Sequence, residues 1–294
     1  MKWMNKIPPI SKHAHKYDRG VVEIHAGSVG AVGAAVIAAR GAAAAGAGLV
    51  RLLVDEAIYP IAATALAVLN PGIMVAPAGT DNAANDGTKD SRFVPDAIVA
   101  GCGWGRGPER KAALQNLLAK AAGTVPLVLD ADAIALLKNI IEENSSFAFK
   151  GNAILTPHTG EAAAFLGVDK KDLLASPEPY LKEASQRLNA HILYKSYNMY
   201  VASPSMNAET LNTIEKLHGE EPVLAQGGSG DLLAGFCGAF LARSKNTPGL
   251  NCRLAALAAA ELLLESARLG PKKILTVNEL AFNAETIAGK VFLP

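Results

Sequence analysis

Short apolar segments alternate with longer helical ones along this chain, and this alternation limits the folds open to it. Gly20–His25 has the pattern of a strand, residues 31–45 that of a helix, and Leu49–Val54 that of a second strand. A strand, a helix and a strand in succession indicate a parallel pair joined by a right-handed crossover. The sequence therefore predicts an α/β fold, with a mostly parallel central sheet and helices on both faces.

The same alternation continues to the C-terminus. Further strands are predicted at 73–76, 97–100, 126–129, 153–155, 191–194 and 199–202, and further helices at 59–69, 108–122, after 132, and at 233–243, 253–268 and about 277–288. Polar residues 78–92 and 204–223 are predicted to be irregular connections. No linker divides the chain, so we expect a surface arm over residues 1–18 and a single domain over 19–294.

Composition and charge exclude several classes of protein. The net charge is +1 and basic residues form no block, which argues against a nucleic-acid partner. The three cysteines are far apart, so a disulfide framework is not expected, and a reducing cytoplasm fits best. The apolar run from Val29 to Val54 contains Arg40 and is broken by glycines, so we predict no membrane span.

Polar residues gather at the ends of the predicted strands. In parallel α/β sheets these carboxyl ends form one edge, which is where ligands bind. The residues placed there are Gly27, Ser28, Gly101, Gly103, Asp130, Asp132, His158 and Glu161. Gly27 to Gly33 does not match the dinucleotide-binding pattern, because its third and sixth positions are Val29 and Val32.

A glycine-rich turn precedes the apolar helix near residue 233. Gly227, Gly228 and Gly230 leave backbone N–H groups open to an anion at a helix N-terminus, and Ser229 adds a hydroxyl. A carboxylate beside a phosphate is repelled unless it has a task, so Asp231 is predicted to be a general base. The alternative is structural, with Ser229 capping the helix and Asp231 complementing its dipole.

Other polar residues carry two interpretations each. Asp130 and Asp132 suit a hydrated Mg²⁺ ion, or else a helix cap and a loop contact. His158 is a candidate ligand-binding donor, or it satisfies backbone groups in its turn. Lys195 ends a strand, where it could meet a phosphate or simply be exposed.

Five segments, in this order, resemble the ADP/ATP-dependent NAD(P)H-hydrate dehydratases. They are Gly27-Ser28 with Gly33-Ala-Ala35, Gly46-Ala-Gly-Leu-Val50, Asp130-Ala-Asp132, Ile154-Leu-Thr-Pro-His-Thr-Gly-Glu161 and Gly227-Gly-Ser-Gly-Asp-Leu-Leu-Ala-Gly235. The resemblance runs from about His15 to Ala288 and implies a ribokinase-like fold. It also implies a lyase that repairs hydrated NADH or NADPH by phosphorylating the C6 hydroxyl with ADP or ATP, with Mg²⁺, and then eliminating phosphate.

The resemblance carries roles over to individual positions. Asp231 is implied as the catalytic residue, and Ala34, Gly103, His158 and Asp231 as contacts of the hydrated cofactor. The implied nucleotide contacts are Lys195, Ser196, Tyr197, Asn198, Met199, Gly228, Ser229 and Gly230. A homo-oligomer, for which a tetramer is one arrangement, is also implied.

The chain departs from the family pattern near the expected nucleotide. Thr159 replaces a proline, Lys195-Ser-Tyr-Asn-Met199 lacks a glycine and a threonine, and Glu220 and Glu221 stand before the glycine turn. A carboxylate at ~4 Å from a phosphate charge opposes it by about 4 kcal/mol at an effective dielectric constant of about 20. Two alternative functions therefore remain open: a kinase of small thiazole or hydroxymethylpyrimidine alcohols, and a non-catalytic nucleotide-binding relative.

Overall fold

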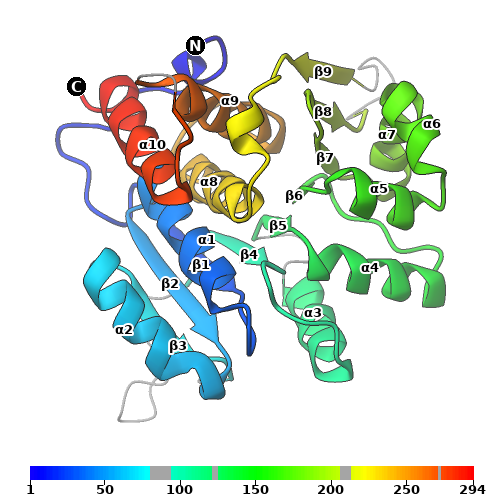
Figure 1. Ribbon diagram of the computed structural model, residues 1–294, viewed down its shortest axis with the longest axis horizontal. Helices are drawn as coiled ribbons and strands as arrows, with labels where there is room; N and C mark the ends of the chain where they lie inside the picture. The colour runs from blue at the N-terminus through cyan, green and yellow to red at the C-terminus, as the bar shows by residue number, and fades with distance from the viewer. Residues whose placement is uncertain (80–93, 121–124, 206–212, 271–272) are drawn as a thin grey trace.

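A nine-stranded sheet forms the centre of the molecule in the computed structural model, which describes residues 1–79, 94–120, 125–205, 213–270 and 273–294. The strand order is β3-β2-β1-β4-β5-β6-β7-β8-β9. The strands are β1 Val21–His25, β2 Leu49–Val54, β3 Met74–Pro77, β4 Ala97–Ala100, β5 Leu127–Leu129, β6 Ala153–Leu155, β7 His191–Lys195, β8 Met199–Ser203 and β9 Thr213–Leu217. Figure 1 shows the sheet crossing the molecule between two groups of helices.

Neighbouring strands from β3 to β7 pair in parallel, whereas β8 and β9 are antiparallel. The predicted mostly parallel α/β sheet is therefore confirmed. The prediction that all of 204–223 is irregular is wrong, because β9 lies within it and pairs with β8. The predicted exposed connection at 78–92 falls almost wholly outside the described residues.

The helices follow the strands in sequence. They are α1 Val32–Ala44, α2 Tyr59–Leu69, α3 Pro108–Lys120, α4 Asp132–Glu143, α5 Thr159–Leu166, α6 Lys170–Ala175, α7 Pro177–Leu188, α8 Ser229–Ser244, α9 Cys252–Arg268 and α10 Val277–Phe292, with short 3₁₀ turns at Met4–Lys6, Glu56–Ile58 and Pro222–Leu224. Helix α8 begins four residues earlier than predicted, so Asp231 lies inside its first turn. None of the described helices is both long and apolar enough to cross a bilayer.

Alternate residues of each central strand face opposite layers of helices. Val99 of β4 and Val128 of β5 pack with α1, α2, α8, α9 and α10. Ile98 and Leu127, their neighbours in sequence, pack with α3 and α4. The opposite face of β7 and β8 carries α5, α6 and α7. Strands buried on both sides explain the continuous apolar runs in the sequence.

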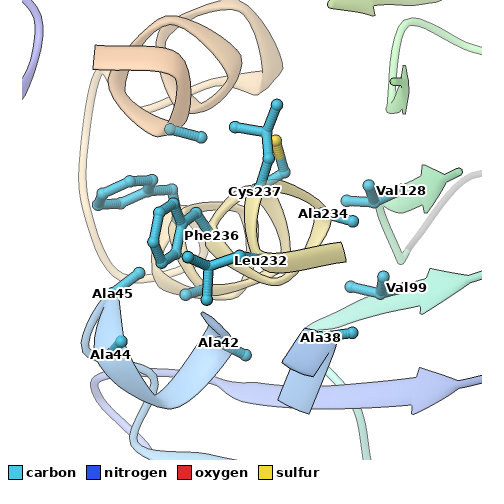
Figure 2. Packing of buried hydrophobic residues seen from close by; sticks show 14 of the residues in the cluster. Ala38, Ala42, Ala44, Ala45, Val99, Val128, Leu232, Ala234, Phe236 and Cys237 are labelled. Carbon is cyan, nitrogen blue, oxygen red and sulfur yellow. The ribbon is translucent and has the colours of Figure 1, made fainter. Parts of the chain in front are cut away.

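Small residues allow α8 to pack directly on α1. A β-carbon on Gly41 would lie 2.5 Å from the carbonyl oxygen of Leu232, and one on Gly235 would lie 2.2 Å from that of Ala38. Alanines such as Ala42 complete the contact (Figure 2). This close packing holds the N-terminus of α8 at the carboxyl edge of the sheet, beside the ends of β5 and β7.

The predicted surface arm, residues 1–18, is docked at its start, whereas residues 8–18 are exposed or half-buried. Trp3, Met4 and Ile7 are buried, and the side chain of Glu261 on α9 accepts hydrogen bonds from the backbone N–H groups of Trp3 (2.9 Å) and Met4 (2.8 Å). Burial of three apolar side chains and pairing of a buried carboxylate stabilise this docked conformation.

Candidate active site

The first turn of α8 presents free backbone donors at the sheet edge. The first N–H group within the helix that bonds back is that of Leu232, which donates to the carbonyl of Gly228 over 2.9 Å. The N–H groups of Ser229, Gly230 and Asp231 have no acceptor among the described residues. Gly228 precedes them with a φ of 95°, a conformation that glycine adopts readily. This turn can therefore hold an anion.

The hydroxyl of Ser229 braces the turn. It lies 2.8 Å from the carbonyl oxygen of Leu224 and 3.1 Å from that of Gln226, and it donates toward them. The hydroxyl proton is thus directed at the protein backbone. Ser229 therefore offers a bound anion its backbone N–H group rather than its hydroxyl.

Lys195 places a positive charge beside this turn. Its ammonium nitrogen lies 2.7 Å from Oδ1 of Asp130, and the hydroxyl of Thr156 donates to the same oxygen over 2.7 Å. The ammonium also lies 3.0 Å from the position that a β-carbon would take on Gly230. Burial opposes the charge on Lys195, but Asp130 and Glu161 outweigh it and raise the lysine pKa above its usual value.

Asp231 shares its surroundings with Asp130 and Cys102. One oxygen of each carboxylate and the sulfur of Cys102 all lie within 4.8 Å of one another. Burial, followed by the charge of Asp130, raises the pKa of Asp231 to about 6. A carboxylate tuned in this way accepts a proton readily near neutral pH.

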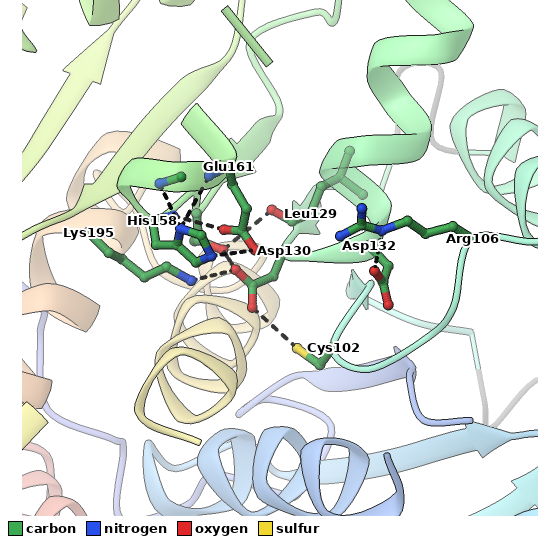
Figure 3. A network of polar contacts seen from close by, with 10 residues as sticks. Cys102, Arg106, Leu129, Asp130, Asp132, His158, Glu161 and Lys195 are labelled. Carbon is green, nitrogen blue, oxygen red and sulfur yellow. Dashed lines mark hydrogen bonds and ion pairs between the residues drawn. The ribbon is translucent and has the colours of Figure 1, made fainter. Parts of the chain in front are cut away.

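Sequence reasoning did not single out Cys102. Its thiol lies 3.7 Å from Oδ2 of Asp130, as Figure 3 shows, and it is fully buried. Burial, followed by the charges of Asp130 and Asp231, raises its pKa well above the usual value, so the sulfur stays protonated and donates a hydrogen bond. The available signal was its position directly after a strand, inside the glycine-rich turn 101–107.

A cavity of about 650 Å³ opens next to the first turn of α8. Six of the predicted nucleotide contacts line it, namely Lys195, Ser196, Tyr197, Met199, Ser229 and Gly230. Asn198 points elsewhere, because its side chain is buried and accepts the N–H of Gly219 over 3.2 Å. Gly228 lies at the helix N-cap, where its β-carbon would be 2.7 Å from Ile37. The size of the cavity suits a nucleotide.

His158 lies at the rim of this cavity and caps α5. Its Nδ1 accepts the N–H groups of Gly160 (2.9 Å) and Glu161 (3.2 Å), and the side chain of Glu161 accepts the N–H of His158 over 2.8 Å. The ring is 58% exposed. The structure shows the capping role, because Nδ1 accepts from the backbone and Nε2 lies 3.4 Å from Oε1 of Glu161. Ligand binding by this exposed ring stays a prediction.

Ala34 and Gly103, two other predicted substrate contacts, lie against each other. A β-carbon on Gly103 would be 2.9 Å from that of Ala34, and the carbonyl of Gly103 accepts the Ser28 hydroxyl over 2.9 Å. The turn after β4 is thereby fixed to the start of α1. Cys102, next in sequence to Gly103, reaches Asp130 and Asp231 from this turn.

The two carboxylates predicted to hold Mg²⁺ have different partners. Asp130 turns to Lys195, whereas the oxygens of Asp132 accept from Nε of Arg106 (2.6 Å) and the N–H of Gly105 (2.8 Å) (Figure 3). Because both Asp132 oxygens are already bonded, the structure does not present the pair as a joint site. The contact of Asp130 Oδ2 with the thiol of Cys102 is long, 3.7 Å, so this oxygen is better placed than those of Asp132 to bind a metal ion.

One of the two glutamates before the glycine turn is neutralised by an arginine. Oε1 of Glu221 lies 2.6 Å from Nε of Arg268, which also bonds the carbonyls of His218 and Gly219. Glu220 is exposed, has a φ of 48° and lines the cavity together with Glu221. The repulsion expected between these carboxylates and a phosphate is therefore reduced at Glu221, and Glu220 keeps its charge at the cavity wall.

Sequence comparison with known proteins shows the family of this chain. A sequence model described as NAD(P)H-hydrate dehydratase matches residues 22–287. The chain is 32% identical over 259 residues to the ADP-dependent (S)-NAD(P)H-hydrate dehydratase of Neisseria meningitidis serogroup B, covering 87% of this chain and 81% of that one. It is 35% identical over 237 residues to the bifunctional NAD(P)H-hydrate repair enzyme Nnr of Gloeobacter violaceus, covering 79% of this chain but only 42% of the relative.

Among solved structures, the fold matches the ADP/ATP-dependent NAD(P)H-hydrate dehydratase of Bacillus subtilis co-crystallised with ATP and Mg²⁺. The TM-score is 0.78 at 24% sequence identity, over 98% of this chain and 96% of that one. A ribokinase-like protein from Enterococcus faecalis matches with a TM-score of 0.77 at 19% identity, over 99% and 94% of the two chains. These structures establish the ribokinase-like fold that the sequence resemblance implied.

Proposed function

Since the chain belongs to the NAD(P)H-hydrate dehydratase family, we propose that it returns hydrated NADH or NADPH to the reduced cofactor at the expense of ADP or ATP. One observation carries the proposal. Asp231, with its pKa raised to about 6, lies in the first turn of a helix whose free N–H groups border a nucleotide-sized cavity. A base and an anion site thus lie side by side.

The first step is phosphoryl transfer. Asp231 accepts the proton of the C6 hydroxyl as the hydroxyl oxygen attacks the terminal phosphorus of the nucleotide. The bond from that phosphorus to the bridging oxygen breaks and leaves AMP or ADP. The N–H groups of Ser229 and Gly230 and the ammonium of Lys195 stabilise the charge on the transferred group.

The second step is elimination. The ring nitrogen donates its electron pair as the bond between C6 and the phosphate oxygen breaks, and the departing phosphate takes the proton from C5 as the double bond between C5 and C6 forms. Phosphate leaves beside Lys195 and the turn of α8, where its charge is compensated. His158 and the Ala34–Gly103 contact border the same edge and are proposed to hold the hydrated ring.

Mg²⁺ would supply charge neutralisation of the nucleotide phosphates. Such an ion prefers one or two carboxylates and otherwise water and phosphate oxygens. Asp130 is the protein ligand that we propose, because its Oδ2 is directed toward Cys102 and Asp231, whereas Asp132 is engaged with Arg106 and Gly105.

The cellular location and the oligomeric state of the enzyme are also part of the proposal. The three cysteines are buried and unpaired, which fits a reducing cytoplasm. Self-association, for example as a tetramer, is proposed from the family. Sedimentation of the purified chain measures it, and a monomer at micromolar concentration would reject it.

The experiment is a direct assay. Purified protein is incubated with hydrated NADH, Mg²⁺ and either ADP or ATP, and the near-ultraviolet absorbance of the reduced nicotinamide is followed. We expect the absorbance to return with at least one nucleotide. If neither nucleotide restores it, the proposal fails. In that case phosphorylation of a thiazole alcohol identifies a kinase, and a thermal shift with nucleotide but no turnover identifies a non-catalytic nucleotide-binding relative.

A further inference from the structure

A second polar cavity lies at the opposite end of α8 from the glycine turn. It measures about 310 Å³, is open to solvent on one side, and is lined by residues between 8 and 19 and by Arg243 and residues 246–248 at the C-terminal end of the helix. Helix α8 runs from Ser229 to Ser244, and a rise of about 1.5 Å per residue separates the two ends by roughly 20 Å. The second cavity is therefore distinct from the proposed active site.

Arg243 lines this cavity and is 7% exposed. One of its terminal nitrogens donates to the carbonyl of Pro8, and its guanidinium carbon lies 4.8 Å from the centre of the Phe292 ring. No carboxylate of the described residues lies within ion-pair distance of it. A guanidinium held away from water with no counter-charge is unfavourable, unless an anion from solution joins it.

Arg19 brings a second positive charge to the same cavity. Its Nε donates to the carbonyl of Gly46 over 3.1 Å, which leaves its terminal nitrogens for other partners. Arg19 likewise forms no ion pair within the described part of the chain. Burial, followed by the charge of Arg19, lowers the pKa of Arg243 to about 10. Two arginines in one cavity, neither in an ion pair with a described carboxylate, supply the charge and the N–H donors of an anion site.

The remaining lining is polar and small. Thr247 is buried and its hydroxyl forms no hydrogen bond with another described residue, and Ser11, His13 and Asn246 complete one side. Asp18 is the single carboxylate among the described lining residues, and one of its oxygens already accepts the N–H of His15 over 2.7 Å. Positive charge therefore predominates in the cavity.

We propose that this cavity binds a phosphate dianion, either inorganic phosphate or the phosphate group of a small monoester, between the guanidinium groups of Arg19 and Arg243. Guanidinium groups match phosphate oxygens with paired N–H donors. The hydroxyl of Thr247 supplies a further donor. The volume admits a phosphate with a few additional atoms but no dinucleotide, so the site takes a different ligand from the cavity at the glycine turn.

Crystals soaked in tungstate locate the site directly, because tungstate mimics phosphate and scatters anomalously. We expect an anomalous peak within hydrogen-bond distance of both guanidinium groups. A peak at the glycine turn with none at the arginines would overturn the proposal and leave the proposed dehydratase intact. The reverse pattern would support this site while counting against the other.

Solution measurements then test affinity and ligand. Phosphate binding is measured by calorimetry with ADP and Mg²⁺ present in excess, at constant ionic strength, for the wild type, Arg19→Gln, Arg243→Gln and the control Arg187→Gln on α7. We expect about tenfold or greater weakening for Arg19→Gln and no change for the control. If Arg243→Gln fails to fold, Arg19→Gln alone tests the site. Unchanged phosphate affinity in Arg19→Gln would refute the site.

A parallel titration with glycerol phosphate distinguishes the two ligand sources. Tighter binding than that of inorganic phosphate assigns the site to a monoester, and weaker binding assigns it to the free ion. If potassium chloride at the same ionic strength reproduces the heat or the thermal stabilisation, the proposal is rejected.

Discussion

Asp231 and Asp130 bring a carboxylate oxygen each within 4.8 Å of the other, and Lys195 bonds to Asp130 over 2.7 Å. The two acids therefore have unequal surroundings. Asp130 is paired and fully buried, whereas Asp231 bears the repulsion of Asp130 and its own burial. When the surroundings of two neighbouring acids separate their pKa values, the two acids can carry out different tasks. In the proposed mechanism, Asp130 balances the charge of Lys195 and Asp231 exchanges protons.

The pH dependence of turnover follows from this difference. The pKa of Asp231 is raised to about 6, and the base form is the ionised one, so kcat/KM should rise with pH and level off above about 7. Initial rates between pH 5 and 8.5 measure it, with enzyme stability checked at each pH. A profile that is flat from pH 5 upward would contradict the assignment.

Replacing Cys102 should shift that profile. The thiol donates a hydrogen bond that favours ionised Asp231, so Cys102→Ala should move the midpoint of the rate profile above about 6. Cys252→Ala, at a buried thiol on α9, is the control and should leave the midpoint in place. Equal midpoints in all three proteins would show that Cys102 only fills space.

Lys195 and Asp130 should behave as a coupled pair. Lys195→Met leaves a buried carboxylate without its counter-charge and should cost about 3–5 kcal/mol of unfolding free energy, which Asp130→Asn in the same chain should largely restore. Both variants should bind nucleotide weakly, because the charge beside Gly230 is gone. Denaturant unfolding and nucleotide titration measure the two effects. Additive losses in the double variant would contradict the coupling.

Magnesium dependence separates the two predicted ligands. Asp132 is bonded to Arg106 and Gly105, so Asp132→Asn should change the half-saturating Mg²⁺ concentration by less than about twofold and cost about 1 kcal/mol of stability. Asp130→Asn should raise that concentration several-fold. Initial rates across a Mg²⁺ titration give both values. A large shift in Asp132→Asn would support the sequence-based prediction that Asp130 and Asp132 bind Mg²⁺ together.

Much of the fold could be predicted because it depends on local patterns. Runs such as Ala97–Ala100 and Ala153–Leu155 are apolar on both faces, and the polar residues that follow them mark one edge of a parallel sheet. Strand β9 escaped prediction because Thr-Ile-Glu-Lys-Leu is half polar and becomes a strand only by pairing with β8. The docking of Trp3 depends on Glu261, which is far away in sequence.

The site could be predicted less completely, for the same physical reason. Glycines 228 and 230 and Asp231 share one short segment, so their joint role is visible in the sequence. The turn of Asp132 toward Arg106, the pairing of Glu221 with Arg268 and the position of Cys102 beside Asp130 all depend on tertiary contacts. Spacing along the chain carries no information about such partners.

The variant Asp231→Asn tests the central claim most directly. Its amide keeps the shape of the side chain but cannot accept the proton, so recovery of NADH from its hydrate should slow by about 10²–10⁴-fold. The pKa of Asp231 is raised from 3.8 to about 6, so its ionised form destabilises the folded state above pH 7, and the amide removes this cost. The variant should therefore be as stable as the wild type or roughly 1–3 kcal/mol more stable above pH 7. A folded Asp231→Asn protein that restores the nicotinamide absorbance at the wild-type rate would contradict the account.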